Sequence, residues 1–456
     1  MFVKSVHAAA ALAGAFVAPK ELDITDSVSI RSVASTIAHG VMSLYTGNVT
    51  NTEDTLAIWP APIYWWESGA AWGAMLDYFH YTGDSTYNDV ITQAVLSQVG
   101  PNFDLMVPRH EGDEGNDDQA FWSFTILEAA ERNFPQPDDS VPSWLDIAIN
   151  TWNTMAARWD TAYCGGGLYW QIFASNANGM HYKNSVSNGG FFQLSARLAR
   201  ATGNDTYLDW AQKVWDWSES IGFVSDAYGN GALDVLDGGD ISDNCAKVNQ
   251  VSFSYSQGIY LYGAAVLYNY TNGNETWGDR VTKLLNGTES YFSPYDNATD
   301  IMFEHACETY DICKTDMLSF KAYMSRFMWA TTQMVPSTLS TIQAKLQVNA
   351  KAAGSACSGG DSGTTCGFKW YVGGYDGNTG LGQQLSALET IQGLLVQEST
   401  APLKAGEIEH VKGDAATTTS SSSTTPTVKR SSSAGKLSST ASALGLAFVA
   451  LLWHFI

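Results

Sequence analysis

Two adjacent acids, Asp117 and Asp118, stand in the stretch GDEGNDDQAFW, where a glycine-broken acidic loop runs into an aromatic segment. Like charges at close range are costly unless they are solvated, bind a cation or do chemistry. Glycoside hydrolysis requires two carboxyl groups with different pKa values, and neighbours on a helix point about 100° apart, so such a pair can flank one anomeric carbon. The helix N-terminus favours one as a carboxylate, and its charge raises the pKa of the other. We interpret the pair as catalytic.

Two other interpretations of the pair stay open. Asn116 is the expected N-cap and Gln119 completes a pattern resembling a capping box, so both acids fall in the first turn of a helix. Acids in that position stabilise a helix dipole without any catalytic role. A calcium site is the other chemical reading, but the acids lack the EF-hand order of ligands. We expect no metal and no cofactor.

The body between about Glu21 and Leu403 has the periodicity of helices, with almost no alternating β-type runs. Three stretches, YTGDSTYNDV, ATGNDTYLDW and TNGNETWGDR, repeat a glycine stop followed by a polar cap. Twelve helices are expected to start near Val28, Trp65, Thr86, Asp117, Ser143, Gly189, Thr206, Phe253, Glu275, Met317, Ser337 and Leu381.

Links between these helices alternate between short turns and long loops rich in glycine and aromatic residues. This alternation predicts an all-α fold, an (α/α)6 barrel of six helical hairpins with the long loops on one face. The even-numbered helices would form the inner ring, with their N-termini at that face. The Asp pair opens the fourth helix and is therefore expected at the mouth of the barrel.

The two ends of the chain carry targeting signals. Residues 1–18 have a cation and a short apolar run, as a secretory signal peptide does. After a catalytic domain over 19–403, residues 404–433 form a Ser/Thr-rich stalk, and residues 434–456 end in an apolar tail typical of a GPI-attachment propeptide, with Ser433 as the expected attachment residue. We expect a secreted protein anchored at the outer face of the plasma membrane or in the cell wall, held to the membrane only through the GPI lipid.

Glycosylation signals and cysteines agree with export. Six Asn-x-Thr sequons predict N-glycosylation at Asn48, Asn204, Asn269, Asn274, Asn286 and Asn297. Six cysteines are an even number, which suggests disulfides in an oxidising compartment. Cys307 with Cys313 and Cys357 with Cys366 could close small loops, which would leave Cys164 with Cys245, although spacing leaves the connectivity open.

Composition narrows the class of ligand. A formal net charge of −22 argues against nucleic acids, which need a basic face. Aromatic residues make up 12% of the chain, which fits either a large core or a cleft where sugar rings stack on aromatic rings.

Several stretches resemble the fungal members of glycoside hydrolase family 76, the GPI-anchored mannan endo-1,6-α-mannosidases of cell-wall synthesis. They are YWWESGAAWGAMLDYF, EGNDDQAFW, RWDTAYCGGGLYWQIF, YKNSVSNGG, ARLARATGNDTYLDWA and SFKAYMSRF. The resemblance implies an (α/α)6 barrel and a retaining mechanism on α-1,6-mannosidic bonds, with Asp117 as nucleophile and Asp118 as acid/base. It further implies transglycosylation, in which the mannose core of a GPI glycan or an α-mannan donor is cleaved and passed to a β-glucan acceptor of the wall.

The subsites are expected among polar and aromatic residues near the same mouth. The candidates for substrate binding are Trp65, Trp66, Glu67, Trp122, Trp170, Gln171, Asn188 and Lys321. Each tryptophan has core packing as its alternative, Asn188 could cap a helix, and Lys321 could offset the acidic mouth instead of meeting substrate phosphate.

The competing function is a non-catalytic mannan-binding scaffold of the cell wall. A binder gains more from neutral amides, because two adjacent carboxylates cost desolvation and repel each other. We therefore predict an enzyme, acting as a monomer.

Overall fold

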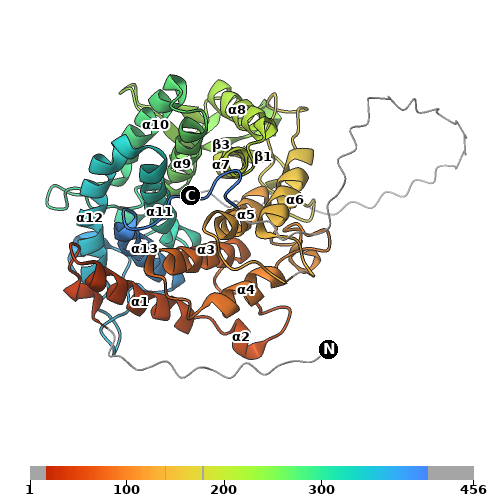
Figure 1. Cartoon of the computed structure of the whole chain (residues 1–456). Helices are drawn as coiled ribbons and strands as arrows, with labels where there is room; N and C mark the ends of the chain where they lie inside the picture. Colours follow the sequence, from red (N-terminus) through yellow and green to blue (C-terminus); the bar gives the residue numbers. More distant parts are fainter. Residues whose placement is uncertain (1–16, 139, 177–178, 409–456) are drawn as a thin grey trace, which may run out of the picture. The chain divides into compact units, whose positions relative to one another are not determined.

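The computed structural model describes residues 17–138, 140–176 and 179–408. Within them, twelve helices of ten or more residues form two concentric rings, as Figure 1 shows. The inner ring consists of α3 (Trp65–Thr82), α5 (Asn116–Glu131), α7 (Ser185–Thr202), α9 (Ser254–Tyr270), α11 (Phe320–Met334) and α13 (Leu381–Gln392). The outer ring consists of α1 (Ser27–Ser43), α4 (Asn88–Ser97), α6 (Trp144–Ala157), α8 (Asp205–Ser220), α10 (Glu275–Gly287) and α12 (Leu339–Ala356), and α2 (Gly47–Thr50) is a single turn. All twelve predicted helices and the (α/α)6 barrel are confirmed.

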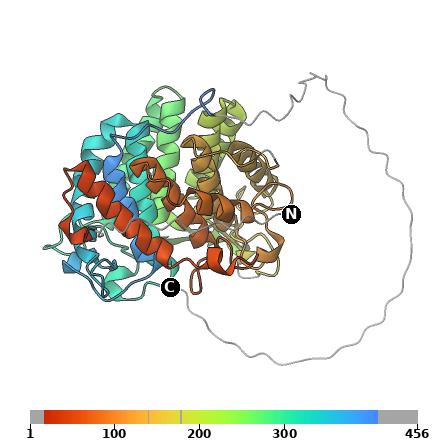
Figure 2. The same ribbon diagram turned by 60° about the horizontal axis from the view of Figure 1, so that its bottom comes forward.

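The inner ring closes on itself. Contacts run from α3 to α5, α7, α9, α11 and α13 in turn, and α13 packs back on α3. Because the chain returns along an outer helix after each inner one, the six inner helices run in the same direction and begin at the same end. Figure 2 shows α1 lying diagonally across the outside of the ring. The predicted assignment of the even-numbered helices to the inner ring is confirmed.

Sequence periodicity decides which ring a helix joins. In α10 only Trp277, Val281, Leu284 and Gly287 are buried, a single stripe spaced by three or four residues. In α7, by contrast, every residue from Ser185 to Ala201 is buried. A helix buried on every side has neighbours all round it, so α7 belongs to the inner ring.

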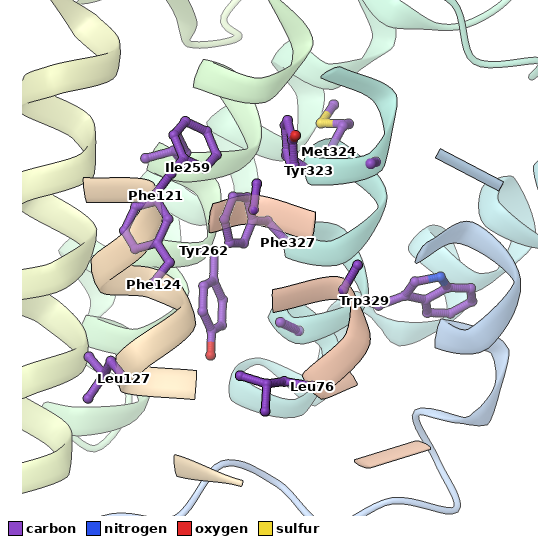
Figure 3. Close-up of a cluster of buried hydrophobic side chains, with 14 of the residues drawn as sticks. Leu76, Phe121, Phe124, Leu127, Ile259, Tyr262, Tyr323, Met324, Phe327 and Trp329 are labelled. Carbon is purple, nitrogen blue, oxygen red and sulfur yellow. The ribbon is translucent and has the colours of Figure 1, made fainter. Parts of the chain in front are cut away.

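Aromatic side chains fill the middle of the inner ring (Figure 3). Phe124 of α5 and Tyr262 of α9 each pack on Phe327 of α11, with ring centroids 5.8 Å apart in both pairs. Burial of each such ring stabilises the fold by up to about 3 kcal/mol. The middle of the barrel is therefore a packed core, and a substrate site has to lie at an end.

Charged side chains are buried towards the C-terminal ends of the inner helices. This charged core consists of Asp77, Glu128, Glu131, Arg132, Arg197, Arg326 and Glu389. Arg197 pairs with Glu131 at 2.6 Å and Arg326 with Glu389 at 2.5 Å, so Arg326 has a structural role rather than a place at the mouth. The segment after α13 covers this end, where the Leu403 N–H donates to the carbonyl of Glu131.

Long loops and a small antiparallel sheet occupy the opposite end. The central strand β3 (Asp234–Asp240) pairs with β1 (Tyr182–Asn184), β2 (Val224–Ser225) and β4 (Val248–Ser252). Disulfides Cys164–Cys245, Cys307–Cys313 and Cys357–Cys366 all lie in the loops that precede inner helices. The predicted pairing is confirmed, and the first bridge ties the loop before α7 to the loop before α9.

The terminal signals fall almost wholly outside the described residues. The predicted signal peptide, the stalk, the attachment propeptide and Ser433 lie there, apart from residues 17–18 and 404–408. Within the described part of the chain, every helix is too short or too polar to cross a bilayer.

Candidate active site

Helix α5 begins at Asn116, so its cap lies one residue earlier than predicted. Gly115 is the N-cap, and the Asp118 carboxylate accepts a hydrogen bond from the Gly115 N–H at 2.8 Å. The prediction of Asn116 as the cap is wrong, because a carboxylate at the third helical position reaches back to the free N–H of the cap. Asn116 instead accepts from Arg158 and donates to the Tyr169 carbonyl.

Gly115 lets the two carboxyl groups of the pair approach each other. A Cβ placed on Gly115 would lie 2.5 Å from Asp117 Oδ1 and 2.5 Å from Asp118 Oδ2. These two oxygens are therefore at most about 5 Å apart, since both surround one point. Retaining glycosidases place their carboxyl groups about 5–5.5 Å apart, whereas inverting ones leave room for a water at about 6.5–9.5 Å. This upper bound lies below the separation of inverting enzymes, so the pair leaves no room for the water that an inverting enzyme holds between its carboxyl groups.

The environment separates the pKa values of the two carboxyl groups. Burial raises the pKa of Asp117, while backbone N–H groups, Asp118 and Trp170 lower it. The net result is a pKa of about 6. Burial and then the Asp117 charge raise the pKa of Asp118 well above its ordinary range. Near neutral pH the pair holds one proton, on Asp118, beside the carboxylate of Asp117. This is the division that a nucleophile and a general acid need.

The pH dependence of activity follows from this division. We expect kcat/KM to rise by about tenfold per pH unit up to about pH 6, because Asp117 must lose its proton to attack. It should fall again only at higher pH, where Asp118 loses the proton that it has to donate. A profile of kcat/KM against pH checks this. Its two apparent pKa values belong to the coupled pair rather than to either residue alone. A profile that is flat between pH 4 and 6 would contradict it.

Trp170 and Gln171 lie beside the pair. The Asn116 N–H donates to the Trp170 carbonyl at 2.8 Å, and Gln171 forms an isolated β-bridge with Gly115. The Trp170 side chain is partly exposed, and its interaction with Asp117 lowers the pKa of that carboxyl group. The structure therefore brings these two candidates together with the acids, as the sequence predicted.

Buried polar contacts hold the loop segment that carries Trp170. Asn188 accepts from the Leu168 N–H and donates to the Leu168 carbonyl, at 2.8 and 3.0 Å. The Trp170 N–H donates to the Tyr182 carbonyl. Asn188 has no exposed surface and the cap of α7 is Asn184, so Asn188 is a positioning residue and neither a substrate contact nor a cap.

An aromatic wall adjoins the pair. It consists of Trp66, Phe121, Tyr255, Phe320 and Tyr323. Trp66 packs on Phe121, one turn after the acids, with centroids 4.6 Å apart, and Tyr255 stacks on Phe320 at 3.9 Å. Trp66 and Tyr255 are only partly buried. Rings that keep some exposed surface next to two carboxyl groups offer a surface on which a sugar can stack.

Four further candidates are buried and contact the protein interior. Trp65 donates to Gln98, Glu67 accepts from the Tyr64 N–H, Trp122 packs under Gly69, and Lys321 pairs with Glu308 at 3.1 Å. Their side chains are at most 4% exposed, so they have no face to offer a sugar. We withdraw the prediction of direct substrate contact for Trp65, Glu67, Trp122 and Lys321, as for Asn188.

Three residues near the site were not singled out from sequence. Tyr255 stands in the stretch YSQG at the start of α9, at the mouth end of the barrel. Burial is the main cause that raises the pKa of Tyr255, and the charge of Asp117 raises it further. Asp237 accepts from the Tyr182 hydroxyl at 2.7 Å, and burial raises its pKa. Burial also raises the pKa of Asp316, whose charge acts on Tyr255. Lone acids in long loops carry no spacing signal, so only the fold could bring them to the site.

Metal binding finds little support in the described ranges. There, no three or more His, Cys, Asp or Glu side chains are grouped closely enough to hold a metal ion. The chemistry that the described residues offer is that of two carboxyl groups.

The chain is similar to known glycoside hydrolases. The model of glycosyl hydrolase family 76 matches residues 29–406. The mannan endo-1,6-alpha-mannosidase DCW1 of Eremothecium gossypii is 44% identical over 395 residues, covering 87% of this chain and 85% of the relative. The mannan endo-1,6-alpha-mannosidase DFG5 of Saccharomyces cerevisiae is 42% identical over 395 residues, covering 87% and 84%.

Solved structures share the barrel. Dfg5 from Chaetomium thermophilum in complex with glucosamine has a TM-score of 0.80 and 38% identity, covering 86% of this chain and 96% of that one. An inactive variant of an alpha-1,6-mannanase of Salegentibacter in complex with alpha-1,6-mannotriose has a TM-score of 0.62 at 18% identity, covering 80% and 99%. At that identity the likeness extends to the fold alone.

Proposed function

Since this chain belongs to glycosyl hydrolase family 76, we propose that it cleaves α-1,6-mannosidic bonds with retention, using Asp117 and Asp118. The observation that carries the proposal is the adjacent pair at the start of α5, with one buried carboxyl group kept protonated beside one carboxylate. The curated relatives that act on this linkage by name support the choice of substrate.

Each step of the reaction has a residue for it. Asp118 donates its proton to the glycosidic oxygen while the Asp117 carboxylate attacks the anomeric carbon and forms a glycosyl-enzyme ester. Asp118, now a carboxylate, takes the proton of the incoming acceptor, which displaces Asp117 from the anomeric carbon. The Asp118 carboxyl also accepts from the Gly115 N–H, which fixes its position at the helix N-terminus. Trp170 lowers the pKa of Asp117 and so helps to hold the nucleophile as a carboxylate.

We further propose that a sugar hydroxyl, rather than water, is the main acceptor. The donor would be α-mannan or the mannose core of a GPI glycan, and the acceptor a β-glucan of the cell wall. The aromatic wall supports this, because stacked rings such as Tyr255 on Phe320 exclude water while a sugar ring can lie against them. A GPI anchor would hold the enzyme beside both polymers.

Product analysis tests both parts of the proposal. Residues 19–408, produced as a secreted protein, are incubated with a short α-1,6-mannan, with and without a β-glucan oligosaccharide. We expect cleavage, products whose new anomeric centre is first α by NMR, and mannose–glucan adducts that exceed free mannose when acceptor is present. Cleavage without adducts would remove the transfer role. Binding without any cleavage would favour the wall scaffold instead.

A further inference from the structure

One of the six sequons differs from the others in its local sequence. Asn297 has an aromatic residue, Tyr295, two positions before it. The corresponding residues before the other five sequons are Thr46, Thr202, Leu267, Asn272 and Leu284. This spacing matters because the apolar C–H face of a sugar packs well on an aromatic ring.

The loop that carries Asn297 is tightly closed and anchored. The Ala298 N–H donates to the Tyr295 carbonyl at 2.9 Å, which makes Tyr295–Ala298 a β-turn with Asn297 as its third residue. Lys345 of α12 pairs with Asp300 at 3.0 Å, two residues past the turn. The loop thus holds Tyr295 and Asn297 in a fixed relation to each other.

Asn297 also borders a surface hollow of about 370 Å³. The hollow is lined further by Val348, Lys351, Ser355 and Tyr371, among others. The Tyr295 ring is 48% exposed and lies edge-on to Tyr371, with centroids 5.4 Å apart. The glycan attachment point, an exposed ring two residues away and a hollow of sugar size are therefore contiguous.

We propose that the N-glycan of Asn297 is bound by the chain that carries it. The first N-acetylglucosamine packs on the Tyr295 ring, and the next sugar enters the hollow beside Tyr371, where Lys351 and Ser355 offer hydrogen bonds. The glycan would cover an exposed aromatic ring and stiffen the loop between α10 and α11. This proposal depends on export and glycosylation, and is independent of the catalytic function proposed above.

Native-state deglycosylation tests the proposal. The full-length glycoprotein, produced in a yeast host, is treated with peptide:N-glycosidase without denaturant, and release at each site is followed by glycopeptide mass spectrometry. We expect glycan release at Asn297 to be slower than at the exposed Asn48 by about twofold to tenfold. This ratio corresponds to the free energy of one aromatic contact. After denaturation the two rates should be equal.

Three variants decide whether the ring is responsible. Tyr295→Ala should abolish the protection of the Asn297 glycan, and Tyr295→Phe should keep it because stacking needs no hydroxyl. Tyr310→Ala removes a tyrosine that is 71% exposed in the same long loop and should change nothing. An unglycosylated Asn297, equal native rates at Asn297 and Asn48, or protection that survives Tyr295→Ala would each overturn the proposal.

Discussion

Replacing Asp117 by asparagine is expected to lower kcat on α-1,6-mannan by on the order of 10⁴-fold, and Asp118→Asn by about 10²–10⁴-fold. The first variant replaces the attacking carboxylate by a neutral amide, which is a poor nucleophile. The second keeps the nucleophile but loses the proton donor, while the amide oxygen at position 118 can still accept from the Gly115 N–H. Initial rates with a defined mannan oligosaccharide measure both effects.

Azide distinguishes the two roles. In Asp118→Ala, azide can intercept the glycosyl-enzyme without a base, so we expect recovered activity and an α-mannosyl azide. In Asp117→Ala, azide would attack the substrate directly and give the β-mannosyl azide. Glu111→Gln removes an exposed acid from the same loop and serves as the matched control, with activity unchanged. Full activity in either Asp→Asn variant, or exchanged azide products, would contradict the assignment.

Replacing Arg197 by methionine is expected to destabilise the protein by about 3–5 kcal/mol. The Arg197 side chain has no exposed surface and pairs with Glu131 at 2.6 Å and Glu128 at 3.4 Å. Without the guanidinium, Glu131 loses its ion pair inside the protein, whereas Glu128 keeps its pair with Arg132 at 2.8 Å, so the cost is that of one unpaired buried charge. The shift of the denaturation midpoint in urea, at unchanged slope, measures it.

Two further variants test whether the loss at position 197 comes from an unpaired buried charge. Arg31→Met removes the surface pair of Arg31 with Glu398 and should cost less than about 1 kcal/mol. Adding Glu131→Gln to Arg197→Met should recover part of the loss, because it removes the carboxylate that has lost its partner. Equal costs at positions 31 and 197 would mean that the charged core contributes no more than a surface pair.

Local signals were sufficient to predict much of the site. Two adjacent acids at a helix start identify themselves by sequence, because helix geometry alone places both in the first turn. The position of Trp170 and Gln171 near the pair could also be predicted, since a long loop before an inner helix must end at the mouth. The cap was misplaced by one residue because Asn116 and Gly115 are both acceptable caps, and only the bond from Gly115 to Asp118 decides between them.

The sequence by itself determined the twelve helices, their alternation between rings and the position of the two adjacent acids, because these depend on periodicity, glycine stops and neighbouring residues. Tertiary structure alone decided which aromatic rings keep an exposed face beside the pair. Trp66 and Trp122 look alike in sequence, yet Trp66 lies in the aromatic wall and Trp122 is buried against Gly69. It also decided that Lys321 pairs with Glu308 inside the protein and that Tyr255 reaches the pair from α9. Such outcomes depend on contacts between residues far apart in the chain, where packing and desolvation decide and local spacing carries no signal.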